Sequence, residues 1–354
     1  MIVRKASKRI ESSMAATIKD IAQSLKLSMS TVSYALNGGP RSVSEDVRRK
    51  VALRARELGY RPNKIAKSLA TGRAHAIALV PPQVSEDWFL SPYLILAFNG
   101  VVKEAGRRGL DVVVYTAVEE ADPSEVMAKF QDGRVDGVIF VAPFVDKQLH
   151  SFASTCPLPS AAITGQPVDG ISSFCVDNER GIRLSLQHLY GLGHRKIAHI
   201  AGRRGLQDAE ARRMAFLNFA DEMELCQSPG YCEEGDFTIE GGRRAMRQLL
   251  SLPERPTAVV CANDEMAIGA LKQAANMGIR VPHDVSVTGF DDSPNSSFVI
   301  PSLTTVRQPI MSMGEAAVGA LASLIAGDPY PSLTIFPTEL IVRDSTSYPT
   351  KETP

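Results

Sequence analysis

After Gly72, short apolar runs alternate with stretches that have the spacing of amphipathic helices, and this alternation governs most of the chain. The apolar runs are His75 to Pro81, Leu110 to Tyr115, Gly137 to Val141, Ala161 to Thr164, Lys196 to Ala201, Ala258 to Ala262 and Val285 to Phe290. The helical stretches are Tyr93 to Gly109, Ser124 to Asp132, Arg180 to Leu192, Asp208 to Met223, Ile239 to Leu250 and Glu265 to Met277. Such alternation predicts parallel α/β sheets, and the stretch is long enough for two doubly wound lobes.

Charge divides the chain at Arg73. Up to that residue there are sixteen Lys and Arg against five Asp and Glu, whereas the whole chain has 39 of each and a formal net charge of zero. The N-terminal head therefore carries about +11 and the body about −11. A compact basic module favours a nucleic-acid partner, because phosphates attract clustered Lys and Arg. A solvated basic surface without such a partner is the alternative.

The cysteines and the hydropathy of the chain indicate in which cell compartment the protein is expected. The five cysteines form no CxxC pair, which argues against a zinc finger or a disulfide framework and favours reduced thiols. Residues 1–14 are basic and polar without an apolar core, and no stretch reaches eighteen apolar residues. We therefore expect a cytoplasmic protein with a disordered basic stub at 1–14, in which Met14 is an alternative start.

Residues 15–62 predict three short helices. A capping pair, Thr17 and Asp20, starts the first, the second runs from Met29 to Leu36, and the third starts at Ser44. The tight turn between the first two helices predicts an all-α helix-turn-helix domain.

A helix-turn-helix seats the N-terminal end of its second helix against base edges in the major groove. Met29, Ser30 and Tyr34 lie on the outward side of that helix and are the expected base readers. The polar residues expected at phosphates are Thr17, Thr31, Ser33 and Asn37. A three-helix protein-binding bundle is the alternative, and the excess of positive charge argues against it.

Several motifs in order carry a family resemblance: residues 16–22 (ATIKDIA), 28–33 (SMSTVS), 58–63 (LGYRPN) and 66–69 (AKSL). Together they resemble the LacI/GalR family of bacterial repressors, and the likeness extends from about Ala15 to Ser345. The resemblance implies a homodimer, with a tetramer left open, on a palindromic double-stranded DNA operator. Many relatives have arginine where this chain has Tyr34, so their operator sequence does not transfer.

Residues 63–73 have helical spacing but are short and polar, so by themselves they favour an ordinary linker. The resemblance implies instead a hinge helix that forms on DNA, with Asn63, Ala66 and Leu69 at the DNA. In that reading Leu69 wedges into a minor-groove step, and Ala66 permits close packing of paired hinges.

Polar residues that directly follow apolar strands are candidates for ligand binding, because ligands sit beyond the carboxyl ends of parallel strands. Asn263 and Asp291 occupy such positions, and their neighbours Asp264 and Asp292 are expected to cap the following helices. The resemblance adds Arg213 and Phe237 as effector contacts, with Arg212 able to exchange roles with Arg213. It also implies Tyr93, from the other lobe.

The resemblance implies a body like periplasmic sugar-binding proteins. The first lobe is expected to comprise residues 74–171 and 307–335, and the second 172–306 and 336–350. A small-molecule effector, expected to be a sugar, would bind between them.

An enzyme is not expected. The sequence has no GxSxG elbow, no GxGxxG or GxxxxGK[ST] phosphate loop and no clustered histidines, so we expect no catalytic residues, metal or cofactor. The leading hypothesis is a repressor of a carbohydrate-use operon. A repressor controlled by a purine or a protein coregulator is an alternative within that class. A solute-binding module is an alternative from another class, and it would need an export signal.

Overall fold

The computed structural model describes residues 16–38, 41–61, 68, 71–82, 91–115, 130–143, 149, 155–163, 167–225, 228 and 230–350. The chain divides into two compact units, Met1–Gly72 and Arg73–Pro354, which we call the head and the body. The boundary lies one residue from the position at which the charge of the sequence changes.

The head contains three described helices, α1 (Ile18–Leu25), α2 (Met29–Asn37) and α3 (Glu45–Glu57). The predicted capping pair is confirmed: Asp20 N donates to Thr17 Oγ1 at 3.3 Å, and Thr17 N donates to Asp20 Oδ2 at 2.8 Å. This reciprocal pair satisfies amides that would otherwise lack a partner at the helix start.

The three helices of the head enclose a small apolar core. Ile21, Val32 and Val51 contribute one fully buried side chain from each helix. Between α1 and α2 the backbone turns at Lys26, whose φ of 53° closes the first helix in a left-handed conformation. The core therefore fixes which side of α2 faces outward.

The body contains two six-stranded sheets. The first has the order β11-β5-β4-β3-β1-β2 and the second β12-β10-β9-β8-β6-β7. Their strands are β1 (Ala76–Val80), β2 (Asp111–Val114), β3 (Val138–Val141), β4 (Ser160–Ile163), β5 (Ser172–Val176), β6 (Ile197–Ala201), β7 (Cys232–Glu234), β8 (Ala258–Cys261), β9 (Ser286–Asp291), β10 (Thr304–Arg307), β11 (Leu333–Phe336) and β12 (Glu339–Ile341). Every described pairing is parallel except that of β10 with β12, so the predicted class of two parallel-sheet lobes is confirmed.

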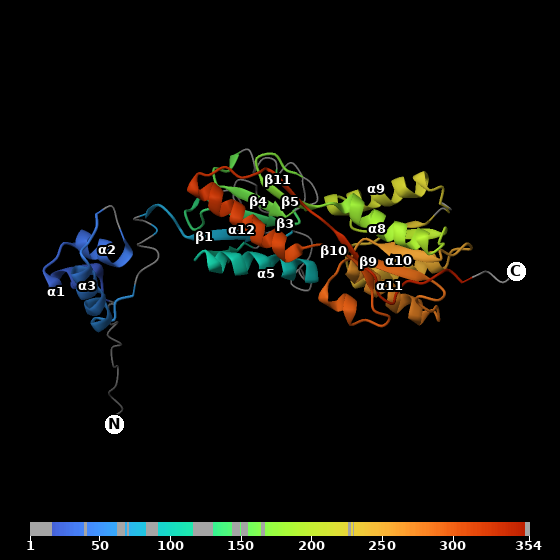
Figure 1. The fold of residues 1–354 in the computed structure, drawn as a ribbon, viewed down its shortest axis with the longest axis horizontal. Helices are drawn as coiled ribbons and strands as arrows, with labels where there is room; N and C mark the ends of the chain where they lie inside the picture. The colour runs from blue at the N-terminus through green and yellow to red at the C-terminus, as the bar shows by residue number, and fades with distance from the viewer. Residues whose placement is uncertain are drawn as a thin grey trace, which may run out of the picture. The chain divides into compact units, whose positions relative to one another are not determined.

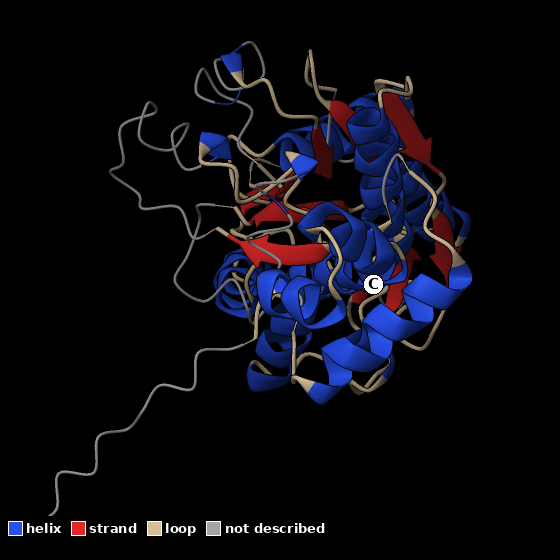
Figure 2. Ribbon diagram, turned by 90° about the vertical axis from the view of Figure 1, so that its left-hand side faces the viewer, coloured by secondary structure: helices blue, strands red, loops and turns tan. Residues whose placement is uncertain are grey.

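Helices cover both faces of the second sheet. Figure 1 shows α8 (Asn178–Gly191) and α9 (Gln207–Glu222) on one side, with α10 (Ile239–Leu250) and α11 (Asp264–Asn276) on the other. Figure 2 shows the strands of the body lying between helices. Two separate apolar clusters, one on each face of this sheet, result from that arrangement.

The chain passes between the lobes at three places, and the first differs from expectation. The predicted boundary after residue 171 is wrong, because β5 pairs with β4 and β11 of the first sheet. The resemblance alone gave that boundary, and within the first lobe Ser173 Oγ accepts from Val168 N and donates to Ile171 O. The first crossing therefore lies at Asp177, and the other two follow β10, which ends at Arg307, and β11, which ends at Phe336.

In the first lobe, α5 (Pro92–Arg107) packs closely against α12 (Ile310–Ala326), a helix that the strand and helix pattern did not indicate. Glycines make the approach possible. A Cβ at Gly100 would lie 2.1 Å from the carbonyl oxygen of Met311, and one at Gly314 would lie 2.5 Å from that of Ala97. Backbone atoms have little freedom to move aside, so this contact requires glycine.

We predict that Gly100→Ala destabilises the body by about 1–3 kcal/mol, because the added methyl group forces α5 and α12 apart. Gly106→Ala is the matched control on the same helix, since a Cβ there meets nothing within 4 Å. That control should be neutral or stabilising by up to about 1 kcal/mol. Urea unfolding of the full chain measures both, and equal effects at the two positions would contradict the packing argument.

Candidate functional sites

The start of α2 is the exposed part of the head's second helix. Ser28 caps it, with Thr31 N donating to Ser28 Oγ at 3.0 Å. The same oxygen shares hydrogen bonds with Ser30 Oγ at 2.9 Å and Thr31 Oγ1 at 2.7 Å. The side chain of Met29 is apolar, unlike these hydroxyl groups, and it is 56% exposed. The first turn of α2 thus presents one free apolar side chain beside a network of hydroxyls.

The other predicted DNA contacts in the head lie at different depths. Asn37 is exposed, whereas Ser33 and Tyr34 are half-buried. The hydroxyl of Thr17 donates to Asp20 Oδ2 at 2.8 Å, so it is already engaged in the cap of α1. The predicted contacts at Asn63, Ala66 and Leu69 lie outside the described residues. All of these roles remain predictions.

In the body, a buried arginine joins the carboxyl ends of two strands. Arg212 on α9 donates through Nε to Asn178 Oδ1 at 2.8 Å and through Nη1 to the carbonyl of Ala262 at 2.6 Å. Its guanidinium lies 3.7 Å from the centre of the Phe290 ring, and Nη1 lies 3.9 Å from Asp291 Oδ1. The side chain is only 4% exposed. Stacking, hydrogen bonds and a carboxylate together compensate for removing this charge from water.

Asp291 ends β9 with a φ of 121°, a conformation that non-glycine residues rarely adopt. Its Oδ1 accepts from Gln308 Nε2 at 2.5 Å, and the residue is 5% exposed. Burial raises the pKa of Asp291 to about 7, against the opposing effects of Arg212 and Gln308. The carboxyl group therefore changes its charge near neutral pH.

Asn263 is fixed by its role as the N-cap of α11. Its Oδ1 accepts from Met266 N at 3.0 Å, and its Nδ2 donates to the carbonyl of Phe237 at 3.1 Å. Each amide atom retains capacity for one further hydrogen bond. The ring of Phe237 packs on Gly202, where a Cβ would lie 2.2 Å from the ring. The hydrogen bond to the Phe237 carbonyl thus holds the amide of Asn263 next to the residue that carries the aromatic ring.

The first lobe contributes Tyr93, the second residue of α5. Burial raises the pKa of its hydroxyl well above the ordinary value, and the charges of Asp208 and Asp291 raise it further. Asp208 in turn accepts from Asn178 Nδ2 at 2.6 Å. We call Arg212, Asp291, Asn178, Asp208, Gln308 and Tyr93 the interlobe polar cluster.

The charge of Asp291 acts on the hydroxyl of Tyr93, whereas Arg213 pairs elsewhere. Arg213 Nε pairs with Glu210 at 3.0 Å on a part of α9 where its side chain is 40% exposed. It is Arg212, the residue considered as its replacement, that reaches Asp291. Consecutive side chains on a helix point about 100° apart, so Arg212 and Arg213 face different sides of α9 and only Arg212 faces Asp291.

Neither Asp264 nor Asp292 has the helix-capping role expected from the sequence. Asn263, not Asp264, caps α11, while Asp264 is fully buried and accepts from Thr305 Oγ1 and Ser293 N. Asp292 caps no helix but binds Arg307 and Arg343 at 2.7 and 2.5 Å. Burial opposes ionisation of Asp292, yet the two arginines outweigh it and lower its pKa. Asp292 therefore joins two arginines of the second lobe, whereas burial, and after it the charge of Asp291, raises the pKa of Asp264 well above its ordinary value.

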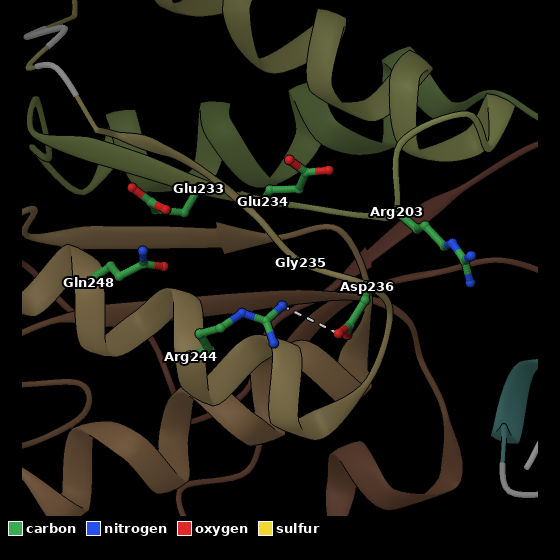
Figure 3. Close-up of a pocket in the computed structure, with 7 residues that line it drawn as sticks. All are labelled: Arg203, Glu233, Glu234, Gly235, Asp236, Arg244 and Gln248. Carbon is green, nitrogen blue, oxygen red and sulfur yellow. Dashed lines mark hydrogen bonds and ion pairs between the residues drawn. The ribbon is translucent and has the colours of Figure 1, made fainter. Parts of the chain in front are cut away.

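A separate pocket of about 470 Å³ lies on the second lobe alone, between β7 and α10 (Figure 3). Its lining comprises Arg203, Glu233, Glu234, Gly235, Asp236, Arg244 and Gln248. Arg244 already pairs with Asp236 at 3.4 Å, and Arg204 pairs with Glu234 at 3.0 Å. None of the predicted effector contacts lines this pocket, so we assign it no ligand.

Comparison with known proteins decides the family. Residues 17–63 match the family described as bacterial regulatory proteins, lacI family, and residues 186–346 match a periplasmic binding protein-like domain. The chain is 31% identical to the HTH-type transcriptional repressor CytR of Escherichia coli K12, over 94% of this chain and 96% of that protein. It is 33% identical to the ribose operon repressor of the same organism, over 86% of this chain and 92% of that protein. The chain belongs to the lacI family of bacterial regulatory proteins.

Solved structures agree with this lacI-family assignment. The lac repressor dimer bound to operator and the anti-inducer ONPF gives a TM-score of 0.82 at 29% identity, covering 94% of this chain and 99% of that one. A complex of the transcriptional regulator CelR with cellobiose gives 0.71 at 30% identity, covering 93% and 99%. The resemblance stated from the sequence motifs is thereby confirmed.

Within the described residues, no group of three histidine, cysteine, aspartate or glutamate side chains is placed to hold a metal ion. The helices described for this lacI-family chain include none that is long and apolar enough to cross a membrane.

The raised pKa of Asp291 predicts a pH-dependent stability. Between its ordinary pKa near 4 and about 7, the folded protein binds a proton that the unfolded chain releases, so the free energy of unfolding falls as pH rises. Asp291→Asn should remove this contribution. The stability of the variant relative to the unsubstituted protein should therefore rise between pH 4.5 and 8 and then level off. Parallel thermal unfolding curves at all pH values would contradict the assignment. His199, whose pKa burial lowers to about 4, titrates in both proteins and cancels from the difference. Burial, and after it the charge of Asp291, raises the pKa of Asp264, so the difference reports these two carboxyl groups together.

Proposed function

We propose that this chain is a sequence-specific DNA-binding repressor, acting as a dimer on a palindromic operator and controlled by a small neutral sugar. The observation that carries the proposal is the exposed first turn of α2 on a basic helix-turn-helix head within a lacI-family chain. The relatives named above are repressors, and the proposal includes no catalytic activity.

The head supplies what DNA binding requires. Its buried core holds α2 with Met29 and Ser30 outward, and the surrounding excess of Lys and Arg supplies attraction to phosphates. We retain Tyr34 as a base reader and the hydroxyls of Thr17, Thr31 and Ser33 as phosphate contacts. Asn37 joins the latter group, and the hinge residues Asn63, Ala66 and Leu69 complete the proposed interface.

The interlobe polar cluster favours a neutral, hydroxyl-bearing effector. Asp208 and Asp291 can accept hydrogen bonds from sugar hydroxyls, and Arg212 can donate to them. An anionic effector would meet the carboxylate of Asp208 and the partly ionised carboxyl group of Asp291 against one guanidinium. Phe237 offers an apolar face beside Asn263, which suits the face of a sugar ring. Among the relatives, CelR is in complex with cellobiose and another protein is a ribose operon repressor.

The interlobe polar cluster also provides a way for ligand binding to change the affinity for DNA. Asn178 follows the first crossing between the lobes, and Gln308 lies at the second. Asn178 binds Arg212, and Gln308 binds Asp291, so the groups that would hold the ligand contact the segments about which the lobes move. A ligand with different affinity for two lobe arrangements shifts their populations, and DNA affinity changes reciprocally.

Exposed apolar side chains on the second lobe support the dimer. Phe298 is 83% exposed and Ile300 is 95% exposed, in the loop between the short helix at residues 294–297 and β10. Large apolar side chains this close together and this exposed are typical of surfaces that bind another protein. A second copy of this chain is the proposed occupant.

Selection from a random DNA pool tests the proposal. With competitor DNA at physiological salt, the full chain should enrich a palindrome that it binds roughly 10³-fold or more tightly than unrelated DNA. Leu69→Ala should weaken specific binding more than non-specific binding. Only salt-sensitive binding without a preferred sequence would refute the proposal.

The effector contacts are tested by thermal shift against neutral sugars, acidic sugars and purines. A neutral sugar should stabilise the protein. Arg213→Gln should retain this response, whereas Arg212→Gln should weaken sugar binding by about 10- to 100-fold, because a charged hydrogen bond is lost. The opposite result for the two neighbours would overturn the assignment of Arg212. Stabilisation by purines alone would identify the other effector class, and no response to any compound would indicate a protein coregulator.

A further inference from the structure

Met29 is the first residue of α2 and its most exposed large apolar side chain. It is 56% exposed, although Val32 and Ala35 of the same helix are buried in the core of the head. Burying a thioether side chain in contact with a partner is favourable, and leaving it in water brings no compensating hydrogen bond. In helix-turn-helix domains, residues at the N-terminal end of the second helix meet base edges in the major groove. The position and the chemistry of Met29 therefore select an apolar feature on a base.

The neighbouring hydroxyls discriminate weakly. Ser30 Oγ and Thr31 Oγ1 both hydrogen-bond to Ser28 Oγ, which also accepts from Thr31 N. A serine hydroxyl either donates or accepts, so Ser30 is able to face several base edges. Sequence preference at the first turn of α2 then depends mainly on Met29.

The major-groove edges of the four base pairs differ in one apolar group. Guanine, cytosine and adenine present hydrogen-bond donors and acceptors, whereas thymine adds a C5 methyl group. A thioether placed over a donor or acceptor would remove water from it without replacing the hydrogen bond. We propose that Met29 reads the C5 methyl group of one thymine in each operator half-site. This inference rests on the proposed function, because it requires a specific operator.

The experiment begins with the operator enriched from a random pool by the full chain. Each thymine is replaced in turn by deoxyuridine, which removes only the C5 methyl group, and binding is measured by fluorescence anisotropy. One thymine per half-site should be sensitive, with affinity falling about fourfold for one half-site and roughly sixteenfold for both. For Met29→Ala the same replacement should change affinity by less than about twofold, since the methyl group has lost its partner.

Two further measurements test the same contact, one with modified bases and one with a second Met29 variant. Cytosine at the sensitive position should weaken binding, and 5-methylcytosine should recover part of the loss because it restores the methyl group at the same atom. Met29→Gln should shift the preference there toward adenine, to which glutamine forms two hydrogen bonds. Leu53→Ala is the matched control: Leu53 is 55% exposed on α3 of the same head, and its removal should leave the deoxyuridine effect unchanged.

The outcomes separate this inference from the proposed function. An enriched palindrome in which no thymine is sensitive to deoxyuridine, or whose sensitivity persists in Met29→Ala, overturns the role of Met29 and leaves the repressor proposal standing. Failure to enrich any palindrome overturns both. A deoxyuridine effect that disappears in Met29→Ala and persists in Leu53→Ala supports the inference.

Discussion

The body depends on one buried charge, the guanidinium of Arg212. It lies between the ring of Phe290 and the carboxyl group of Asp291, and it also binds Asn178 and the end of β8 at Ala262. Removing a charge from water is costly, so each of these partners must remain in place for the residue to be tolerated. Removing Arg212 would leave Asp291 without its cationic neighbour. A single side chain thus couples the ends of two strands to the first crossing between the lobes.

The same interaction explains why a ligand is expected at this point. Within the cluster Arg212 and Asp291 are buried, and Asp291, at the end of β9, is held at a positive φ with its pKa raised to about 7. Backbone strain and a shifted pKa are both enriched at binding sites, and here both occur at one residue, Asp291. In the head, by contrast, the surface proposed to bind DNA is exposed. There a well-packed core of Ile21, Val32 and Val51 leaves Met29 in solvent.

Agreement between sequence and structure is best where a local rule decides the outcome. The cap formed by Thr17 and Asp20, the three head helices and the parallel class of both sheets follow from spacing and capping chemistry, which involve neighbours along the chain. The family resemblance was likewise carried by contiguous motifs. The positions of Asn263 and Asp291, directly after apolar strands, were recognisable for the same reason, although their function as effector contacts remains a proposal.

The sequence by itself determined the helix-turn-helix head, the division of charge at Arg73 and the alternation that builds two α/β lobes, because these depend on residues close in the chain. Only the tertiary structure decided which arginine of the pair is buried, since Arg212 and Arg213 differ by one step of a helix whose orientation is set by packing. It also decided that β5 joins the first sheet, where local hydrogen bonds satisfy Ser173, and that Asn263 rather than Asp264 caps α11. The burial of Arg212 and of Asp264 depends on partners far away in the sequence, Ala262 for Arg212 and Thr305 for Asp264, and no local pattern records them.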